Sequence, residues 1–529
     1  MDSTAALALL YLAALRRRGN NSNTLPPGPR GLPLVGSLPS LDPQLHAYFA
    51  RLAARYGPIF SIRLGSKLGV VVTSPALARE VLRDQDLLFS GRDVPDAARS
   101  ISYGGGQNIV WNPVGPTWRL LRRVCVREML SPAGLDAVRA LRDREFRATL
   151  RHLHAQAAAA APVDVGAQMF LATMNVITAT LWGGTIGSDA ERAKVGKEFR
   201  HLVAEITDML GAPNVSDFFP ALARFDLQGI RRKSDVLKER FNQMFARIID
   251  QRVRADQADG EPPAAPDFLE YMLKLEKEGG DGKAAFTMTN VKALLMDMVV
   301  GGTETTSNTV EWAMAELMRA PRLLAKVREE LDGVVGRDAV VEEAHLPQLP
   351  YLHAVLKETL RLHPALPLMV PHCPDADATV ADYRVPAGSR VFVNVWAIMR
   401  DPAVWEDPAE FVPERFLPGG GDGRKLDFGL PAVRVRTQDL RGDRHGRPHD
   451  GLLAGHAAAG VRLGAAGGSA AGHGGKVRDR DEEGHAAGGR ADPEAVQAGA
   501  LLRLVSVCVS MCPSTPRMLQ VDLMFYFYI

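Results

Sequence analysis

Residues 299–314 read VVGGTETTSNTVEWAM and lie inside a long stretch of helical periodicity. Gly301 and Gly302 each destabilise a helix interior by about 1 kcal/mol relative to alanine. Their presence despite this cost is explained if a large group approaches the backbone there. Hydroxyls of the TETT run can bond back to helix carbonyls and widen the helix. Glu304 beside Thr305 places an acid next to an alcohol, a pair that can pass protons to a ligand on this face. A solvated Ser/Thr-rich kink is the alternative, and the segment alone supports both.

Around this helix the pattern is that of a mainly α protein with small β-sheets (α+β). Through residues 41–429, the expected globular body, most segments place apolar residues at three- and four-residue spacing, as helices do. Short β-type runs interrupt them at 59–64, 68–73 and 390–398. Hydrophobic residues make up 46% of the 529 residues, which is enough for a sizeable core.

Charge and cysteine content exclude some classes of protein. The formal net charge is only +2, so nothing in the composition favours nucleic-acid binding. Four cysteines, Cys125, Cys373, Cys508 and Cys512, are too few for a disulfide framework in so long a chain and fit a reducing compartment. The Cys508–Cys512 spacing without a nearby histidine is a poor metal signature.

The N-terminus predicts a short membrane anchor, residues 1–18. Ala5–Leu15 is an unbroken apolar run of 11 residues followed by Arg16–Arg18. A spanning helix needs about 20 residues, so a surface or core helix is the alternative. Basic residues after the run predict that the rest of the chain stays cytosolic, whereas a signal peptide carries them before it. Residues 19–40, which include LPPGPRGLPLVGSL, predict a Pro-rich hinge.

A second motif, KETLRLHP at residues 357–364, carries an ion pair. Glu358 and Arg361 lie three residues apart, on one face of a helix. Apolar neighbours favour a buried pair, which must be fully hydrogen-bonded, over an ordinary surface pair. Arg415 in FVPERF offers a second guanidinium for the same carboxylate.

A third motif, PTWRLLRRV at residues 116–124, places Trp118 and Arg122 four residues apart. An indole N–H and a guanidinium are both donors, and together they can hold a carboxylate. An amphipathic helix with a buried tryptophan is the alternative, and it is the better reading of this motif by itself.

Together these segments resemble the cytochrome P-450 family. The motifs that carry the resemblance are GGTETT, KETLR, YRVPAG, NVWAIMRDP, WEDPAEFVPERF and WRLLRR. PPGPRGLPLVG after an apolar run is similar to the microsomal, plant A-type members. LHPALPLMVPH and NVWAIMRDPAVW resemble the branch that contains geraniol hydroxylase-like monoterpenoid oxidases. The resemblance covers residues 1–429 and makes 41–429 the expected catalytic domain.

The resemblance implies a role for each residue of the first motif. Glu304 and Thr305 would be the catalytic acid–alcohol pair that delivers protons during oxygen activation. Gly301 and Gly302 would let the cofactor, haem b, and the substrate lie against the helix.

The resemblance also implies roles for the other motifs. A structural triad behind the haem would consist of Glu358, Arg361 and Arg415. Donors to a haem propionate would be Trp118, Arg122 and His372. The chain departs from the family next to the last of these, at Cys373, where a basic residue is expected.

Activity, partners and location follow from the same resemblance. The expected reaction is a haem-thiolate monooxygenation of a small apolar metabolite, terpenoid-like or another secondary metabolite. NADPH would act through a separate NADPH-cytochrome reductase, since no flavin or dinucleotide fingerprint is visible. The expected location is the endoplasmic reticulum membrane, with the catalytic domain on the cytosolic face. Specificity would lie around Ser100–Val114, Phe199–Asp217 and Ala365–Val370.

The family also needs a cysteine thiolate on the iron, in a loop like FGxGRRxCxG. The chain follows the family as far as DFG, ending at Gly429, and then reads LPAVRVRTQDLRGDRHG. No cysteine occurs between Cys373 and Cys508, so no metal ligand is assigned. From Leu430 to Met524 there is no aromatic residue, a composition that does not predict a packed core.

Our hypothesis is that residues 430–529 are an out-of-frame translation, and we expect such a tail to be disordered. Back-translated with GC-rich codons and shifted by one base, residues 430–446 read FRPFGSGRRICAGIAM, a complete haem loop. The same shift turns residues 476–495 into KFGIVMKKATPLVAVPTPR, which resembles the family's C-terminal strand region. The alternatives are an ordinary disordered tail, a catalytically inactive or pseudogene product, and a metal-binding tail whose histidines are irregularly spaced.

Overall fold

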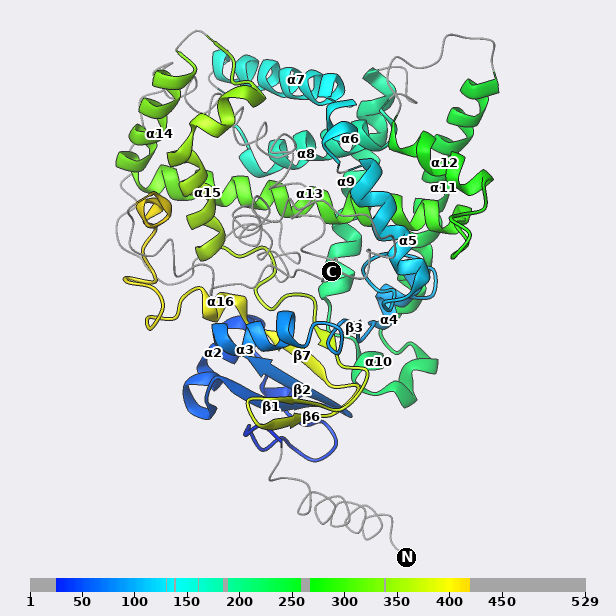
Figure 1. The fold of residues 1–529 in the computed structure, drawn as a ribbon, viewed down its shortest axis with the longest axis vertical. Helices are drawn as coiled ribbons and strands as arrows, with labels where there is room; N and C mark the ends of the chain where they lie inside the picture. Colours follow the sequence, from blue (N-terminus) through cyan, green and yellow to red (C-terminus); the bar gives the residue numbers. More distant parts are fainter. Residues whose placement is uncertain are drawn as a thin grey trace, which may run out of the picture.

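The computed structural model describes residues 25–418, apart from residues 130, 138, 160, 184–188, 258–266 and 337–338. The described part is mostly helical, with one sheet of five strands and one of two (Figure 1). This confirms the expected mainly α fold with small β-sheets. The expected anchor and the expected out-of-frame tail lie outside the described residues.

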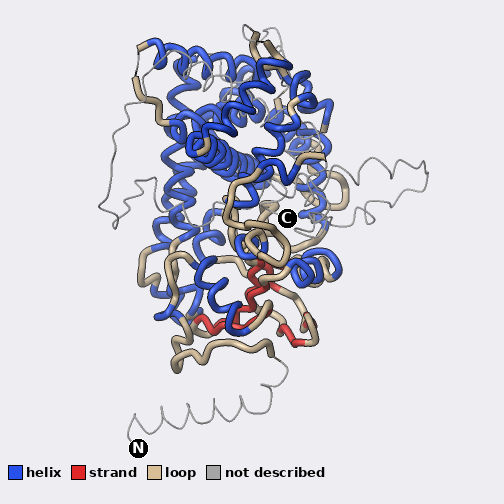
Figure 2. The backbone as a smooth tube through the Cα atoms, turned by 90° about the vertical axis from the view of Figure 1, so that its left-hand side faces the viewer, coloured by secondary structure: helices blue, strands red, loops and turns tan. Residues whose placement is uncertain are grey.

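Long helices build the larger part of the molecule. Figure 2 shows them gathered at one end, with the strands at the other. Their bounds are α7 (Arg139–Ala158), α8 (Val165–Trp182), α9 (Asp189–Gly211), α11 (Ile230–Gln257), α12 (Phe268–Lys277), α13 (Met288–Arg319), α14 (Pro321–Val334) and α15 (Pro350–Leu362). Shorter helices are α2 (Leu45–Tyr56), α3 (Pro75–Arg79), α4 (Asp96–Ile101), α5 (Pro116–Val124), α6 (Pro132–Ala137), α10 (Val215–Phe218) and α16 (Val395–Ile398).

Helix α13 crosses the middle of this helical part (Figure 1). It begins at a capping box, in which the Asn290 backbone N–H donates to Thr287 Oγ1 and the Thr287 backbone N–H donates to Asn290 Oδ1. Such a box satisfies amide groups that the first helical turn leaves without partners. Apolar side chains of the N-terminal half of α13 join one buried cluster, and those of its C-terminal half join another with α14 and α15. The helix therefore forms part of both main cores.

The larger sheet brings together segments far apart in the sequence. Its order is β1-β2-β7-β4-β3. The strands are β1 (Ile59–Leu64), β2 (Lys67–Val72), β3 (Gly91–Arg92), β4 (His372–Cys373) and β7 (Arg390–Val393). Strands β2 and β7 are parallel, with Val71 opposite Phe392, whereas β3 and β4 are antiparallel. The smaller sheet is a hairpin of β5 (Ala378–Val380) and β6 (Tyr383–Val385).

One expected strand is shorter than its pattern predicted. The run 390–398 forms β7 only as far as Val393, and α16 begins at Val395. The reason is local, because the Asn394 side chain accepts a hydrogen bond from the Ala397 backbone N–H at 3.1 Å and caps the helix. Asparagine is among the preferred residues at this position.

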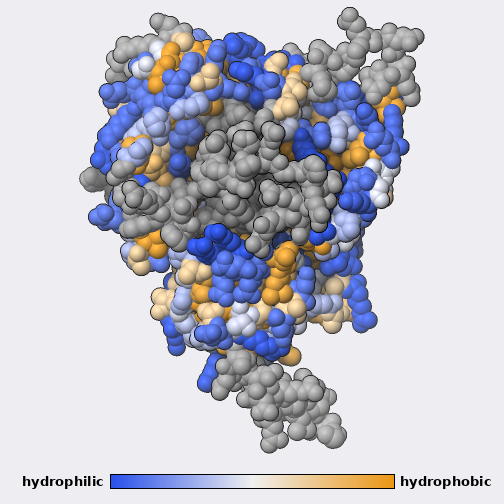
Figure 3. All heavy atoms as spheres, viewed as in Figure 1, coloured by the Kyte–Doolittle hydropathy of each residue, from blue (hydrophilic) through white to orange (hydrophobic). Residues whose placement is uncertain are grey.

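Apolar side chains are scattered over the visible surface. On the face in Figure 3 the described surface is mostly hydrophilic, with apolar residues in separate groups. Among the described residues, one helix, α8, is long and apolar enough to span a membrane, but more than half of it is buried. It packs against α13, as a core helix does.

Candidate functional site

The GGTETT segment lies within an unbroken α13. As expected, its hydroxyls bond back to carbonyls four residues earlier, Thr303 to Val299 at 2.6 Å and Thr305 to Gly301 at 2.9 Å. The helix nevertheless continues from Met288 to Arg319. Gly301 and its neighbour are buried, so the segment is not a solvated kink.

Glu304 is the acid of this segment and is partly buried. Burial raises the pKa of its carboxyl to about 7, and the nearby charge of Asp208 adds to this increase. A hydrogen bond with Thr207 of α9 opposes the increase. A group with a pKa near neutrality can both accept and release a proton at working pH. Helix α13 therefore carries a titratable acid at the residue that directly precedes Thr305.

A second buried acid, Asp297, lies two turns earlier on α13 and was not singled out from the sequence. Its carboxylate accepts hydrogen bonds from Asn108 Nδ2 at 2.9 Å and from the Ile109 backbone N–H at 2.8 Å. Burial raises its pKa to about 7, although these bonds oppose the shift. The donors belong to residues 100–114, which were expected to influence specificity, so α13 holds that segment directly.

Glu358 and Arg361 form the buried pair that the KETLR motif predicted. Arg361 Nε donates to Glu358 Oε2 at 2.7 Å and Nη2 donates to Oε1 at 2.8 Å. The two residues are 0% and 1% exposed, which excludes the surface-pair reading. Arg415 Nε lies 3.4 Å from Glu358 Oε1, so the three expected partners do meet.

Further hydrogen bonds connect this network to the segment that precedes Arg415. Arg361 Nη1 donates to the carbonyls of Met399 and Pro408 at 2.9 and 2.7 Å. The Val412 backbone N–H donates to Glu358 Oε1 at 2.8 Å. A buried ion pair is tolerated when its remaining donors and acceptors are satisfied in this way. The network therefore attaches residues 399–412 to α15.

Trp118 and Arg122 share one face of α5. The guanidinium carbon of Arg122 lies 5.3 Å from the centre of the Trp118 ring. The tryptophan is 6% exposed, and burial lowers the pKa of Arg122 to about 10. This geometry orients a buried cation on an aromatic ring.

His372 lies on β4, directly opposite Arg92 on β3. Its Nδ1 lies 2.7 Å from the Phe89 carbonyl, whereas its buried Nε2 has no hydrogen-bond partner among the described residues. Burial lowers the pKa of His372 well below its usual value, and the charge of Arg92 lowers it further. Arg92 itself donates to the Val370 carbonyl at 2.5 Å.

Sequence reasoning did not identify Arg92. Burial lowers the pKa of its guanidinium to about 10. No local motif marks this arginine, and its relation to His372 exists only because β3 pairs with β4 across 280 positions of sequence.

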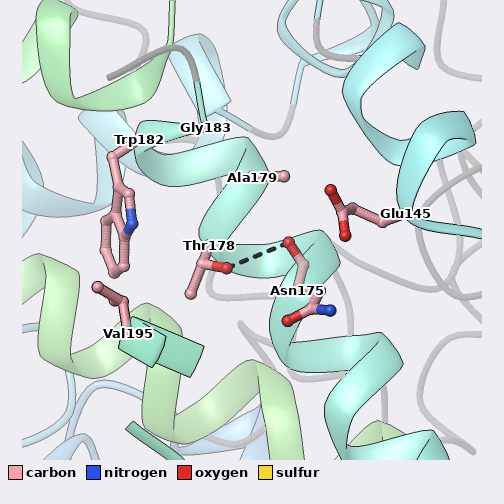
Figure 4. A pocket seen from close by; sticks show the side chains of 7 residues that line it. All are labelled: Glu145, Asn175, Thr178, Ala179, Trp182, Gly183 and Val195. Atoms are coloured by element: carbon pink, nitrogen blue, oxygen red, sulfur yellow. Dashed lines mark hydrogen bonds between the residues drawn. The ribbon is translucent and has the colours of Figure 1, made fainter. Parts of the chain in front are cut away.

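A small hollow lies elsewhere, between α7, α8 and α9 (Figure 4). Its volume is about 20 Å³, room for roughly one water. None of the expected site residues lines it; those that do are Glu145, Asn175, Thr178, Ala179, Trp182, Gly183 and Val195. In the described part of the chain, no cluster of three or more His, Cys, Asp or Glu side chains could hold a metal ion.

Comparison with known proteins identifies the family. The cytochrome P-450 family model matches residues 26–430. The chain is 39% identical over 420 residues to a flavonoid 3'-monooxygenase of Crocosmia x crocosmiiflora, covering 79% of this chain and 80% of that protein. It is 36% identical over 431 residues to a geraniol 8-hydroxylase of Swertia mussotii, covering 81% and 85%.

A solved structure supports the same assignment. A zebra fish cytochrome P-450 with progesterone superposes with a TM-score of 0.60 at 26% identity, covering 70% of this chain and 84% of that chain. The monooxygenase and hydroxylase relatives give no support to the alternative of an inactive product. The chain belongs to the cytochrome P-450 family of oxidoreductases and is similar to plant members such as geraniol 8-hydroxylase.

Proposed function

We propose that this protein inserts one oxygen atom of O₂ into a small apolar metabolite. The second oxygen atom leaves as water, with two electrons from NADPH and two protons. The observation that carries the proposal is the partly buried Glu304, whose pKa is raised to about 7, beside Thr305 on the glycine-containing segment of α13. Proton delivery to a buried reaction needs groups of this kind.

The family implies haem, and the residues present fit its propionate groups. The buried Nε2 of His372 has no partner among the described residues, and a buried polar atom of this kind needs one. The cations Arg92 and Arg122 and the Trp118 indole complete a set of donors suited to carboxylates. Haem, when bound, supplies the oxygen activation.

Within this site the chain's own residues manage protons and position groups. Glu304 can hold a proton near neutral pH and release it to Thr305, whose hydroxyl both donates and accepts. Thr305 Oγ1 donates to the Gly301 carbonyl, which orients its oxygen lone pairs. Glu358, Arg361 and Arg415 keep residues 399–412 in place behind the site.

The axial thiolate is expected from the shifted reading frame. The family match ends at residue 430, one residue beyond Gly429, where the sequence departs from the family. This coincidence supports a frame slip in the printed sequence. Determining the transcript sequence across codons 425–445 tests it, and a transcript that encodes the printed frame would contradict the proposal.

Substrate, partner and location are the finer parts of the proposal. Relatives named for geraniol and for ferruginol support a terpenoid-like substrate. Electrons would come from NADPH-cytochrome reductase, and residues 1–18 would anchor the protein to the endoplasmic reticulum membrane with the catalytic domain in the cytosol.

The decisive assay uses the chain with the re-read frame after Gly429, reductase, NADPH and a panel of terpenoids and flavonoids. We expect a carbon-monoxide difference band of thiolate-ligated haem, and one hydroxylated product per substrate accepted. The matched control replaces the re-read cysteine with serine and should lack the band. A folded re-read chain that binds haem without the thiolate band would refute the assignment.

A further inference from the structure

A histidine attaches the turn after helix α15 to α13. His363 follows the last residue of α15, and its backbone N–H bonds to the Thr359 carbonyl at 2.6 Å. Its ring lies face to face with that of Trp312, with 3.9 Å between the ring centres and 7° between the planes. Its Nε2 lies 2.7 Å from Glu316 Oε1. One imidazole therefore makes two different contacts with α13.

Trp312 and Glu316 reach this ring from the same side of α13. They are four residues apart, so they stand one above the other on one face of the helix. The stacked indole limits tilting of the imidazole, and the carboxylate fixes the rotation of the ring in its own plane. The three side chains form a clasp, Trp312–His363–Glu316, which specifies the position of His363 against α13.

The carboxylate of the clasp is buried and ionised. Glu316 is 8% exposed. Its pKa is lowered, chiefly by the bond with His363; burial acts against the decrease, and the charges of Arg319 and Arg400 add to it. An ionised carboxylate can only accept hydrogen bonds, so Nε2 of His363 is the donor. Because a buried carboxylate strongly resists losing its donor, the clasp is not readily exchanged for water.

The residues that follow, the 365–370 segment, touch three hydrophobic clusters. Leu366 packs on the cluster to which α13, α14 and α15 contribute. Leu368 packs on the cluster between α2 and one face of the larger sheet, whereas Met369 packs on the cluster at the other face of that sheet. This short segment therefore joins a helical core to both faces of the sheet.

The segment contains a strained turn at Met369. The φ angle of this residue is 54°, a left-handed value that is unfavourable for a residue with a Cβ atom. Its backbone N–H bonds to the Leu366 carbonyl at 3.0 Å and closes the turn. A backbone conformation of this kind persists only where the surrounding structure holds it.

Supports lie on both sides of this turn. The Trp396 backbone N–H donates to the Pro367 carbonyl at 3.2 Å, and Arg92 Nη1 donates to the Val370 carbonyl at 2.5 Å. The clasp holds the other end, because His363 lies two residues before the segment begins. The strained turn is therefore suspended between α13 on one side and β3 and α16 on the other.

We propose that His363 is a positioning residue that fixes the start of the 365–370 segment against α13 and thereby keeps the Met369 turn in its strained form. Residues 366–370 are apolar and half-buried, so a shift of the segment changes the shape of the wall that they form. That this wall belongs to the substrate site rests on the proposed function. The holding of the turn is a property of the fold.

Hydrogen exchange of the full chain tests the clasp without haem or turnover. The reporters are the backbone amides of Met369 and Trp396, which bond to carbonyls of the segment. In His363→Ala we expect both amides to exchange about tenfold faster, equivalent to about 1.4 kcal/mol. The Gly388 amide, which bonds to the Pro374 carbonyl, should not change, whereas a general loss of stability would accelerate it as well.

Further variants separate the two contacts of the ring. Trp312→Leu removes the stack and Glu316→Gln removes the charge of the acceptor, and each should accelerate the reporters less than His363→Ala does. Because all three side chains act through one contact, adding either change to His363→Ala should have little further effect. Fully additive effects on the reporters would contradict a single clasp.

The matched control is His353→Ala. His353 lies on the same helix, and its Nε2 lies 3.1 Å from the Leu346 carbonyl, away from the clasp. This variant removes the same side chain and should leave the Met369 and Trp396 amides unchanged. Equal effects of the two histidine variants on the reporters, or equally faster exchange at Gly388 in His363→Ala, would refute the proposal.

Turnover provides the second measurement, in the enzyme whose reading frame is corrected after Gly429. His363→Ala should raise KM and alter the ratio of products, with kcat changed less, and His363→Gln, which keeps an N–H donor for Glu316, should restore part of both. Faster reporter exchange with an unchanged KM and product ratio would overturn the role in substrate positioning. An enzyme without any activity would count against the proposed function, while the exchange result would still decide whether the clasp holds the turn.

Discussion

Asp297 and Glu304 lie two helical turns apart on one face of α13, about 10 Å along the axis. Burial raises the pKa of both carboxyls to about 7. Their partners differ, since Asp297 is bonded by Asn108 and a backbone amide, whereas Glu304 has the Thr207 hydroxyl. One acid therefore holds a neighbouring segment, and the other is left to exchange protons.

Stability should depend on the ionisation of Asp297. Its folded-state pKa of about 7 exceeds the ordinary value of 3.8, so the folded chain binds more protons between those values. The stability this provides is present at low pH and is lost as pH rises through 7. Relative to Asp297→Asn, the unfolding free energy of the unmodified chain should fall by about 2 kcal/mol from about pH 5 to about pH 8.

Urea unfolding of both proteins at the two pH values measures this difference. The control is Asp42→Asn, because the pKa of exposed Asp42 is lowered rather than raised, by its bonds to the Gln44 backbone and to Arg51. A pH-independent difference between the unmodified chain and Asp297→Asn would show that this carboxyl does not titrate in that range.

His372 should titrate at higher pH when Arg92 loses its charge. Burial is the larger cause of its lowered pKa and the charge of Arg92 is the second, so Arg92→Gln should raise the pKa without restoring the ordinary value. Because the pKa of His372 is depressed in the folded state, the unfolding free energy decreases as pH falls below about 6.5. This decrease should be smaller in Arg92→Gln than in the unmodified chain. Histidine-selective NMR titration measures the shift, and Arg99→Gln is an exposed control that should leave His372 unchanged.

The Glu358 network should be the most sensitive ion pair in the described chain. Glu358→Ala leaves Arg361 and Arg415 without their carboxylate in a buried environment, which should lower the unfolding free energy by about 3–5 kcal/mol. Thermal unfolding compares it with Asp42→Ala, which breaks an exposed pair with Arg51 and should lose less than about 1 kcal/mol. Similar losses in the two variants would mean that burial of the pair has no energetic consequence.

In the enzyme whose reading frame is corrected after Gly429, proton delivery should depend on Glu304 and not on the other acidic residues of α13. Glu304→Gln should lower the rate of product formation by about 10²-fold, the usual scale for a lost general acid. Glu311 lies two turns further on the same helix and is exposed, so Glu311→Gln is the matched control and should retain its rate. A Glu304→Gln enzyme with an unchanged rate and an unchanged pH profile would remove this residue from the proton path.

Local relationships were predictable because helix geometry alone determines them. Glu358 and Arg361 had to share a face at a spacing of three, and their apolar neighbours correctly predicted burial. Thr305 was likewise expected to bond back to a carbonyl one turn earlier, and it does. The strand expected at 390–398 failed at Asn394, where one capping side chain outweighs the apolar pattern.

The sequence by itself determined the class of fold, the family and the residues that lie within a helical turn of one another. Only the tertiary structure decided that Arg92 faces His372 and that Asp297 holds Asn108. The residues of the first pair are 280 positions apart in the sequence, and those of the second pair are 189 positions apart. Their positions follow from how β3 docks on β4 and how residues 107–110 pack on α13. Such contacts depend on burial and docking of whole elements, which no local periodicity encodes.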